Sequence, residues 1–307
     1  MKTETLHLMG TVITMQIEHL NAEVLLHKAS EMLRDYEKRF SANDDYSDLM
    51  QVNLNAGIQP VRVDADLFTL IEKAQEVSLS SGQKFNLTIG PLVKLWKIGF
   101  KDAALPEDEA IQQTLKVIQP DNVVLDREQQ TVYLTEAGME IDLGAIAKGY
   151  FADQLKDYFV EQGVESGIID LGGNVVTIGH PLEKKAWTVG VQSPEKSRGN
   201  ILGFIEIHNQ SVVTSGIYER HFYKDDKLYH HILDSKTGYP VENDIASVTI
   251  VSDQSLDGEI WSTICFFTTA EQTIALLNEI NGIDALVIKK NGEIMSTQHL
   301  KKHLYLI

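Results

Sequence analysis

The first third of the chain shows one strand pattern and two helix patterns. Apolar and polar residues alternate over 5–17 (TLHLMGTVITMQI), which predicts a strand or one arm of a hairpin, with Met9-Gly10-Thr11 inside it. Over 21–40, which opens on an asparagine able to act as N-cap, apolar residues recur every three or four positions. This spacing predicts a helix that packs one face on a sheet. Asp64 is expected to cap a second amphipathic helix that ends near Gly82.

The rest of the chain reads as short strands with helices between them. Pro106 stands where a first helical turn would begin, and Pro120 stands where that short helix would stop. Strands are predicted at 123–125, 131–134, 139–142, 167–170, 175–178, 187–191, 204–207, 228–233 and 246–251. Helices are predicted at about 145–162, 256–267 and 271–280. Because the two types mix without a steady βαβ period, linker or repeat, we predict a mixed α+β fold with 1–307 as a single composite domain.

Charge and composition exclude several classes of protein. The chain has 27 Lys plus Arg against 44 Asp plus Glu, a formal charge of −17, and the cations form no long run. We therefore expect no nucleic-acid partner, since phosphate recognition needs clustered cations. Hydrophobic residues make up 43% of the chain, enough to expect a packed core. The single cysteine, Cys265, excludes a disulfide framework and a cysteine-based metal cage, so any metal must be held by oxygen or imidazole.

The sequence as given is not expected to carry a targeting signal. The first twenty residues contain Glu4, His7 and Glu18 and lack the apolar run of a signal peptide. No window approaches the ~18–20 consecutive apolar residues of a membrane helix, and no N-terminal cysteine is available for lipidation. We expect a chain without a transmembrane segment that is cytoplasmic as given, or extracytoplasmic if an export segment has been removed.

The common phosphate-loop and hydrolase motifs are also missing. No G-x-G-x-x-G follows a predicted strand, and neither G-x-x-x-x-G-K-[ST], H-E-x-x-H nor G-x-S-x-G occurs. The remaining candidates are segments rich in glycine and carboxylates between apolar runs. Over 141–150 (IDLGAIAKGY) a predicted strand leads into a helix, whose N-terminal amides suit an anion. An ordinary strand-to-helix turn is the alternative interpretation.

Taken in order, these segments resemble the ApbE family, the FAD:protein FMN transferases. The matching segments are MGT (9–11), FS…S…N (40–53), FNLTIGPLVKLW (85–96), IDLGAIAKGY (141–150) with Asp153, LGGN (171–174), TSGIYER (214–220), HHILDSKTGYP (230–240) and EIWST (259–263). The resemblance spans Met9 to about Phe267. It implies an enzyme that uses FAD as substrate and Mg²⁺ as cofactor, and that transfers FMN to a threonine hydroxyl of an acceptor flavoprotein with release of AMP.

The resemblance also implies roles for individual residues. The positions that match the family's flavin-nucleotide site are Met9, Asn43, Lys84, Phe85, Asn86, Asp142 and Lys148. Magnesium is implied at the main-chain carbonyl of Ala145 and at a carboxylate and a hydroxyl four residues apart, here Glu259 and Thr263, with Ser262 counted in the same set. Residues four apart share a helix face, so two oxygens can meet one cation, and Mg²⁺ prefers oxygen ligands. A solvated helix face with Glu259 as a surface charge is the alternative.

The chain departs from the family pattern at three of these positions. Glu259 stands where the family usually has Asp, which adds a methylene group between helix and carboxylate. Asn43 stands where an aromatic residue is frequent, so stacking on the ligand is weaker or comes from elsewhere. Asn86 replaces a family Asp, which removes a charge and leaves a hydrogen-bonding amide.

A threonine hydroxyl is a weak nucleophile at neutral pH and benefits from a nearby base. Adjacent side chains of a strand point to opposite faces, so one of His230 and His231 can face a site. We take His231 as the catalytic candidate, with Asp234 as its orienter or as a structural turn residue. A histidine that only positions the site is the alternative.

Two other functions stay open at this level. The same metal site with water as nucleophile would make an FAD pyrophosphatase that yields FMN and AMP, and a non-catalytic flavin-binding protein is a further alternative. For transfer, the resemblance implies an acceptor flavoprotein with a threonine-containing motif near D-G-x-[ST]-[ST]-x-A-T.

Overall fold

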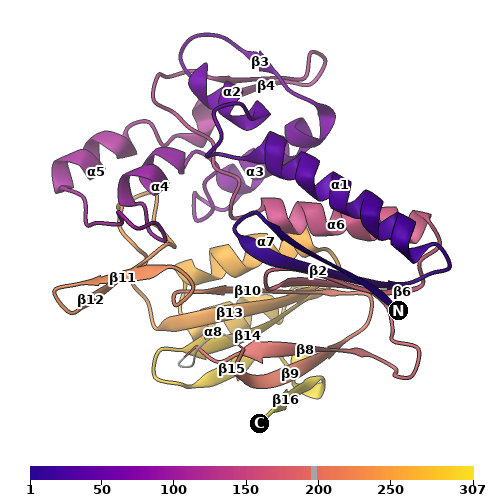
Figure 1. The fold of residues 1–307 in the computed structure, drawn as a ribbon. Coiled ribbons are helices and arrows are strands. Elements are labelled where there is room, and N and C mark those ends of the chain that lie inside the picture. The colour runs from indigo at the N-terminus through magenta and orange to yellow at the C-terminus, as the bar shows by residue number, and fades with distance from the viewer. Residues whose placement is uncertain (195–198) are drawn as a thin grey trace. The chain divides into compact units, whose positions relative to one another are not determined.

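The computed structural model describes residues 1–194 and 199–307 (Figure 1). The chain gathers into two compact units, each built from separate segments. The first unit contains Met1–Asp35, Lys148–Gly216 and Asn243–Ile307, and the second contains Tyr36–Ala147 and Ile217–Glu242. Both units combine helices and strands, so the predicted α+β class is confirmed. The single composite domain stays a prediction.

An eight-stranded sheet forms the centre of the first unit. Its strands, in order across the sheet, are β1 (Lys2–Leu8), β2 (Thr11–Glu18), β6 (Ser166–Leu171), β7 (Asn174–Gly179), β10 (Ser211–Gly216), β13 (Ile245–Ser252), β14 (Ile283–Lys289) and β15 (Ile294–Ser296). Every neighbouring pair is antiparallel. All positions of β13 are buried. Its continuous run of small and apolar residues is typical of a strand that is covered on both faces.

Further layers cover both faces of this sheet. The helices with most of their residues in this unit are α1 (Ala22–Phe40), α6 (Ala147–Glu161), α7 (Ser255–Ile264) and α8 (Ala270–Leu277), with short 3-10 turns η2 (Cys265–Phe267) and η3 (Leu300–Lys302). Helix α7 packs on β10 and β13, and α8 packs on β14. A second sheet has the order β16 (Leu304–Leu306), β9 (Ile201–Ile207), β8 (Trp187–Gln192).

Strand β10 contributes to a core on each of its faces. Val212 belongs to the cluster formed with Val189 and Ile205 of the second sheet. Val213, the next residue, faces α7, because a Cβ added at Gly258 of that helix would lie 2.6 Å from its side chain. This is the two-residue alternation of a strand.

The second unit is smaller and richer in helix. Its elements are α2 (Asp48–Leu54), α3 (Ala65–Ser80), α4 (Gly90–Trp96), α5 (Asp108–Leu115), η1 (Pro120–Asn122), a sheet of β3 (Val61–Arg62), β5 (Thr131–Leu134) and β4 (Val123–Asp126), and the hairpin of β11 (His221–Lys224) and β12 (Lys227–His230). Trp96 lies in its core with Ile111 and Tyr229. The indole Nε1 donates to the carbonyl oxygen of Gly238 at 2.8 Å.

Several local predictions are confirmed and two strand predictions are wrong. Asp64 caps α3 as expected, accepting a hydrogen bond from the main-chain nitrogen of Leu67 at 3.0 Å. Met9 and Gly10 do not lie inside a strand. They form the turn between β1 and β2, with φ angles of 54° and 69°, so the segment 5–17 is a hairpin.

The predicted strand at 139–142 is absent from that segment. The side chain of Asn53 takes the place of a neighbouring strand, because its Oδ1 accepts from the nitrogen of Ile141 at 2.8 Å and its Nδ2 donates to the carbonyl of Ile141 at 3.0 Å. The main-chain groups of Ile141 are therefore satisfied without a sheet.

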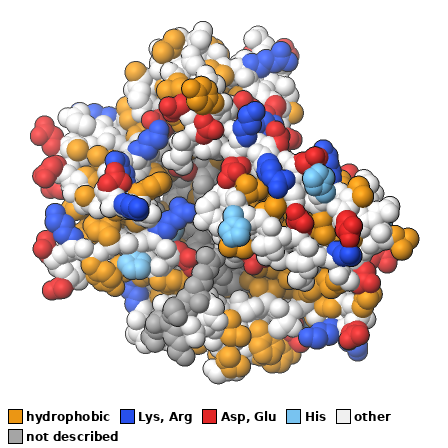
Figure 2. Space-filling model, in the orientation of Figure 1, with side chains coloured by type: hydrophobic (Ala, Val, Ile, Leu, Met, Phe, Trp, Pro, Cys, Tyr) orange, Lys and Arg blue, Asp and Glu red, His pale blue; other side chains and the backbone are white. Residues whose placement is uncertain are grey.

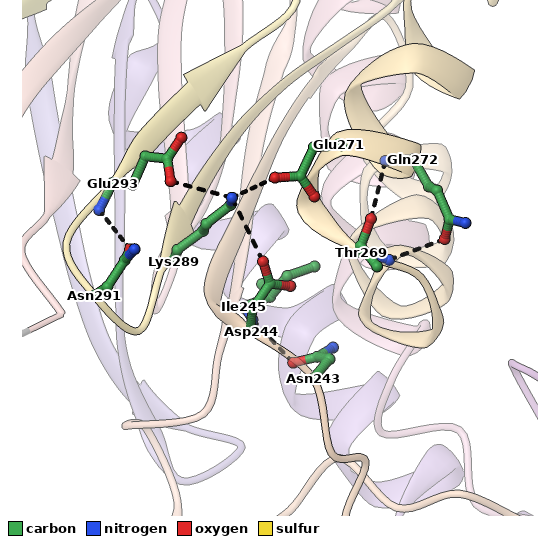
Figure 3. Close-up of polar contacts among 9 residues, drawn as sticks. All are labelled: Asn243, Asp244, Ile245, Thr269, Glu271, Gln272, Lys289, Asn291 and Glu293. Atoms are coloured by element: carbon green, nitrogen blue, oxygen red, sulfur yellow. Dashed lines mark hydrogen bonds and ion pairs between the residues drawn. The ribbon is translucent and has the colours of Figure 1, made fainter.

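Lys289, the last residue of β14, ties β14 to its surroundings through three carboxylates (Figure 3). Its Nζ pairs with Glu271 of α8, with Glu293 at 3.1 Å and with Asp244 at 3.6 Å, while its side chain is only 10% exposed. The hydrogen bonds to Glu271 and Glu293 raise the pKa of Lys289, and the hydrogen bond with Lys289 lowers the pKa of Glu271 to about 2. The cluster joins helix, strand and connecting loop.

Two surface findings bear on the predicted partners. Across the two described stretches of the chain, none of the helices has both the length and the apolar character that crossing a bilayer needs. On the face shown in Figure 2, Lys and Arg side chains are interspersed with Asp and Glu. The expected absence of a nucleic-acid partner and the cytoplasmic location stay predictions.

Candidate active site

Glu259 is a buried residue in the middle of α7 and carries a carboxylate. Asn174, the last residue of the LGGN segment and the first of β7, donates from Nδ2 to Glu259 Oε1 at 2.8 Å. The Nζ of Lys148 lies 3.6 Å from the same oxygen. A buried charge needs such partners, because an isolated one is very costly. Among the described residues, no hydrogen bond or ion pair engages Oε2, so that oxygen can serve another ligand.

A polar network holds Asn174 and the start of α7 in place. The hydroxyl of Ser255 donates to Asn174 Oδ1 at 2.7 Å. The main-chain nitrogens of Ser255 and Leu256 donate to the carboxylate of Asp153, on α6, at 2.7 and 2.8 Å. Burial raises the pKa of Asp153 to about 6, although both N–H groups favour its charged form. Since a carboxylate oxygen accepts hydrogen bonds, the amide of Asn174 is oriented with Nδ2 toward Glu259.

Gly149 of α6 makes room for the side chain of Glu259. A Cβ at position 149 would lie 2.8 Å from Glu259 Cγ, 2.7 Å from the carbonyl oxygen of Ser255 and 2.8 Å from Leu256 Cα. The Cγ is the methylene group that glutamate has and aspartate lacks. The close crossing of α6 and α7 therefore accommodates the longer acid.

The other predicted metal ligands have different surroundings. Thr263 follows Glu259 by about one turn of α7 and is half-buried. Ser262 is fully buried, and its hydroxyl bonds to Ser215 Oγ at 2.9 Å and to the Glu259 carbonyl at 3.1 Å, so it braces the helix. Ala145 is exposed in the turn that precedes α6.

The donor chemistry fits magnesium. No three His, Cys, Asp or Glu side chains gather into a metal cluster within residues 1–194 and 199–307. The implied set needs none, since it combines one carboxylate, one hydroxyl and one main-chain carbonyl with substrate phosphates. Such an all-oxygen set is what Mg²⁺ prefers.

Asp142 lies in a turn of the second unit. This turn contacts the segment that follows the predicted flavin-binding residues 84–86. The Oδ1 of Asp142 accepts from the nitrogen of Gly144 at 2.7 Å, and its own nitrogen donates to the carbonyl of Leu87 at 2.9 Å. Burial raises the pKa of Asp142, while the Gly144 N–H and the charges of Arg220 and Lys94 favour the ionised form. The structure thus brings the segment 84–86 and Asp142 together through Leu87.

Asn86 is a buried residue whose side-chain amide is only half hydrogen-bonded within the described residues. Its Oδ1 accepts from the nitrogen and the hydroxyl of Thr88 at 2.9 and 2.8 Å. Because a main-chain N–H only donates, the atom facing it must be the oxygen, which fixes the amide orientation. Asn86 is 6% exposed, and its Nδ2 has no hydrogen-bond partner in the described part of the chain. Leaving such a donor unpaired costs ~1–3 kcal/mol, so it marks a place for a ligand or water.

The remaining predicted flavin residues are spread over both units. Met9 is half-buried at the tip of the β1–β2 hairpin, in the first unit with Lys148. In the second unit, Asn43 is exposed before α2, its nitrogen bonding to Ser41 Oγ at 3.1 Å; Lys84 is half-buried and Phe85 is buried. Their roles stay predictions.

The contact of His231 Nδ1 favours a neutral ring that is protonated on this nitrogen. This Nδ1 lies 3.2 Å from the carbonyl oxygen of Arg220, which also accepts from the His231 nitrogen at 3.2 Å. A carbonyl only accepts, so in the neutral ring Nδ1 carries the proton and Nε2 carries the lone pair. Asp234 is not the partner of Nδ1. Its Oδ1 accepts from the main-chain nitrogen of Lys236 at 2.8 Å, a contact that is typical of a structural turn residue, the alternative role considered for Asp234.

His230 has a structural role. It is buried, its Nδ1 accepts from the nitrogen of Ile232 at 3.3 Å, and its Nε2 donates to the carbonyl of Val241 at 3.0 Å. The two adjacent histidines therefore differ, as expected for neighbours at the end of a strand. Gly238, with φ of 79°, closes the following turn and accepts from Trp96, which anchors this segment to α4.

Sequence reasoning assigned no role to Asn174, Ser255 or Arg220. The only signal for Asn174 is its place in LGGN, where Gly172 and Gly173 both have positive φ angles and turn the chain directly before it. Ser255 and Arg220 act through a hydroxyl and a main-chain carbonyl, which leave no mark in a single sequence.

Comparisons with known proteins agree with this fold. The sequence profile of the ApbE family matches residues 9–287. An FAD:protein FMN transferase of Klebsiella pneumoniae (strain 342) is 42% identical over 96% of this chain and 92% of its own length. One of Treponema pallidum (strain Nichols) is 36% identical over 91% and 82%. The crystal structure of the ApbE protein of Thermotoga maritima, 28% identical, covers 98% of both chains with a TM-score of 0.89.

The curated relatives at 42% and 36% identity identify the chain as an enzyme of the transferase class. The chain belongs to the ApbE family.

Proposed function

We propose that the chain is a magnesium-dependent FAD:protein FMN transferase that joins FMN to a threonine hydroxyl of an acceptor flavoprotein and releases AMP. The curated relatives that carry the name FAD:protein FMN transferase support the reaction class. The observation that carries the finer proposal is the buried Glu259 carboxylate, held through Oε1 by Asn174 and Lys148 and one helical turn from Thr263.

The metal site would use oxygen ligands alone. Glu259, Thr263 and the main-chain carbonyl of Ala145 would hold the Mg²⁺, with Ser262 bracing Glu259 from within the helix. When bound, the cation would offset negative charge on the phosphoryl oxygens and on the departing AMP. A chain with a formal charge of −17 needs such help to bind a diphosphate.

The residues proposed to bind the flavin nucleotide are Met9, Asn43, Lys84, Phe85, Asn86, Asp142 and Lys148. The unpaired Nδ2 of Asn86 supports this, because an acceptor atom of FAD would satisfy it. Lys148 would supply positive charge to the diphosphate.

The chemical step would be a displacement at phosphorus. The threonine oxygen forms a bond to the phosphorus on the riboflavin side of FAD, and the bond from that phosphorus to the bridging oxygen breaks, so AMP leaves with this oxygen. The hydroxyl proton passes to Nε2 of His231. The carbonyl of Arg220 supports this role, since it holds the proton of Nδ1 and so keeps the lone pair on Nε2.

A peptide with the threonine-containing motif tests the proposal. It is incubated with the protein, FAD and Mg²⁺, with and without a chelator, and followed by mass spectrometry. We expect FMN on the threonine and an equal amount of AMP, both lost with the chelator. Free FMN and AMP without an adduct would indicate an FAD pyrophosphatase, and intact FAD would indicate a binding protein.

Two histidine variants sharpen the test. His231→Ala should abolish the adduct while FAD binding persists, because only the proton acceptor is removed. His221→Ala, on the exposed strand β11, is the matched control and should keep full transfer. Wild-type turnover in His231→Ala would remove this residue from the mechanism.

A further inference from the structure

Lys148 has an unexpected neighbour for a residue assigned to the flavin nucleotide. Its ammonium group lies 3.6 Å from Oε1 of Glu259, the acid proposed to bind the metal. The Glu259 side chain is 7% exposed, and that of Lys148 is 36% exposed. The buried carboxylate therefore has a positive counter-charge already in place.

A divalent cation at Glu259 would compete with this ammonium. Two cations at one buried carboxylate repel each other strongly, since interactions are poorly screened away from water. Lys148 can move, because its charge sits on a flexible, partly exposed stem. Asn174 stays on Oε1 through its own bond to Ser255, so the departure of Lys148 leaves that oxygen satisfied.

The FAD diphosphate offers the ammonium group another partner. We propose that Lys148 is the resident counter-ion of Glu259 in the FAD-free enzyme and transfers to the diphosphate when FAD and the divalent cation bind. The inference rests on the proposed function. It makes binding cooperative, because the cation binds weakly to the free enzyme and more tightly once FAD has drawn Lys148 away. By linkage, the cation strengthens FAD binding by the same factor.

The test measures Mn²⁺ binding by electron paramagnetic resonance and Mg²⁺ binding by calorimetry, without and with FAD. No acceptor is added, so the readout does not depend on turnover. Lys148→Met keeps the stem and removes the charge. Without FAD it should bind the cation more tightly than wild type, by roughly 5- to 150-fold, the usual span of coupling between two ligands. FAD should then add little cation affinity, and FAD itself should bind more weakly.

Matched variants separate the possible outcomes. Lys148→Arg keeps the charge and should retain wild-type coupling. Lys156→Met removes another cation from α6, one that bonds to the carbonyls of Asn209 and Asp253, and should also leave the coupling unchanged. Equal or weaker cation binding by Lys148→Met without FAD overturns the inference.

Failure of the inference can be told apart from failure of the proposed function. If Glu259→Gln binds the cation as well as wild type does, the proposed metal site itself is wrong. If Glu259→Gln loses the cation but Lys148→Met gains nothing, the metal site stands and only the counter-ion role of Lys148 is refuted.

Discussion

Replacing Gly149 by alanine tests whether the close crossing of α6 and α7 sets the position of Glu259. The new Cβ would lie 2.7 Å from the carbonyl oxygen of Ser255 and 2.8 Å from Leu256 Cα, whereas ordinary contacts begin at 3.4 Å. Both are main-chain atoms, which cannot turn aside as a flexible side chain would. The helices must therefore separate by up to about 0.7 Å, the difference between 3.4 and 2.7 Å.

Two opposing energies decide the sign of the effect. Overpacking of a tight contact costs typically ~1–3 kcal/mol. Alanine in a helix interior is favoured over glycine by up to ~1 kcal/mol. Because the contacts at Gly149 are with the main chain, we expect overpacking to dominate. The free energy of unfolding of the variant should then be roughly 1–2 kcal/mol lower than that of the wild type.

Urea unfolding and Mn²⁺ titration of Gly149→Ala measure both consequences. We expect a lower unfolding midpoint and weaker Mn²⁺ binding, since the Cβ would also displace Glu259 Cγ. Glu161→Ala, exposed at the end of α6, is the control for an alanine placed on this helix where the side chain is exposed. A gain in stability with unchanged Mn²⁺ affinity would refute the reasoning, because it would mean that α6 and α7 leave room for a methyl group.

Three further variants test other parts of the structure. Asp153→Asn should make stability depend less on pH. Because the pKa of Asp153 in the folded state, about 6, exceeds the ordinary 3.8, the free energy of unfolding of the wild type should fall by up to ~3 kcal/mol relative to that of the variant between pH 4 and 7, as measured by urea unfolding. Asn86→Asp removes the unpaired donor and should weaken FAD binding roughly tenfold by flavin-fluorescence titration; unchanged affinity would contradict the ligand role. Lys289→Met leaves three facing carboxylates and should lower Tm at neutral pH, less so in high salt; an unchanged Tm would show that the cluster is not stabilising.

The elements that the sequence predicted correctly depend on neighbouring residues. The first long helix follows from its apolar spacing, and the Asp64 cap follows from a side chain that reaches only to Leu67. The failures depend on distant partners or unusual residues. Asn53 pairs with Ile141, 88 positions away, and Met9-Gly10 lacks the Asn-Gly signature of a tight hairpin turn.

In the candidate site, too, the features that depend on neighbouring residues could be predicted, and those that depend on distant residues could not. The spacing of Glu259 and Thr263 on one helix face is readable from the sequence. The donor to Glu259 is not, because Asn174 lies 85 positions earlier and reaches the acid only through the folded sheet. Similarly, the proton position on His231 is set by the Arg220 carbonyl, a group that every residue type carries.

The strands of the large sheet lie side by side in the order in which they occur along the chain. During synthesis, each strand can join the outer strand of those already paired, and no later strand has to be inserted between two earlier ones. The second unit is formed by two chain segments, one after β2 and one after β10. These segments separate consecutive strands of the sheet in the sequence and leave their order across the sheet unchanged. A chain truncated before residue 283 would end the sheet at β13, an apolar strand with an open hydrogen-bonding edge, and we expect such a product to aggregate.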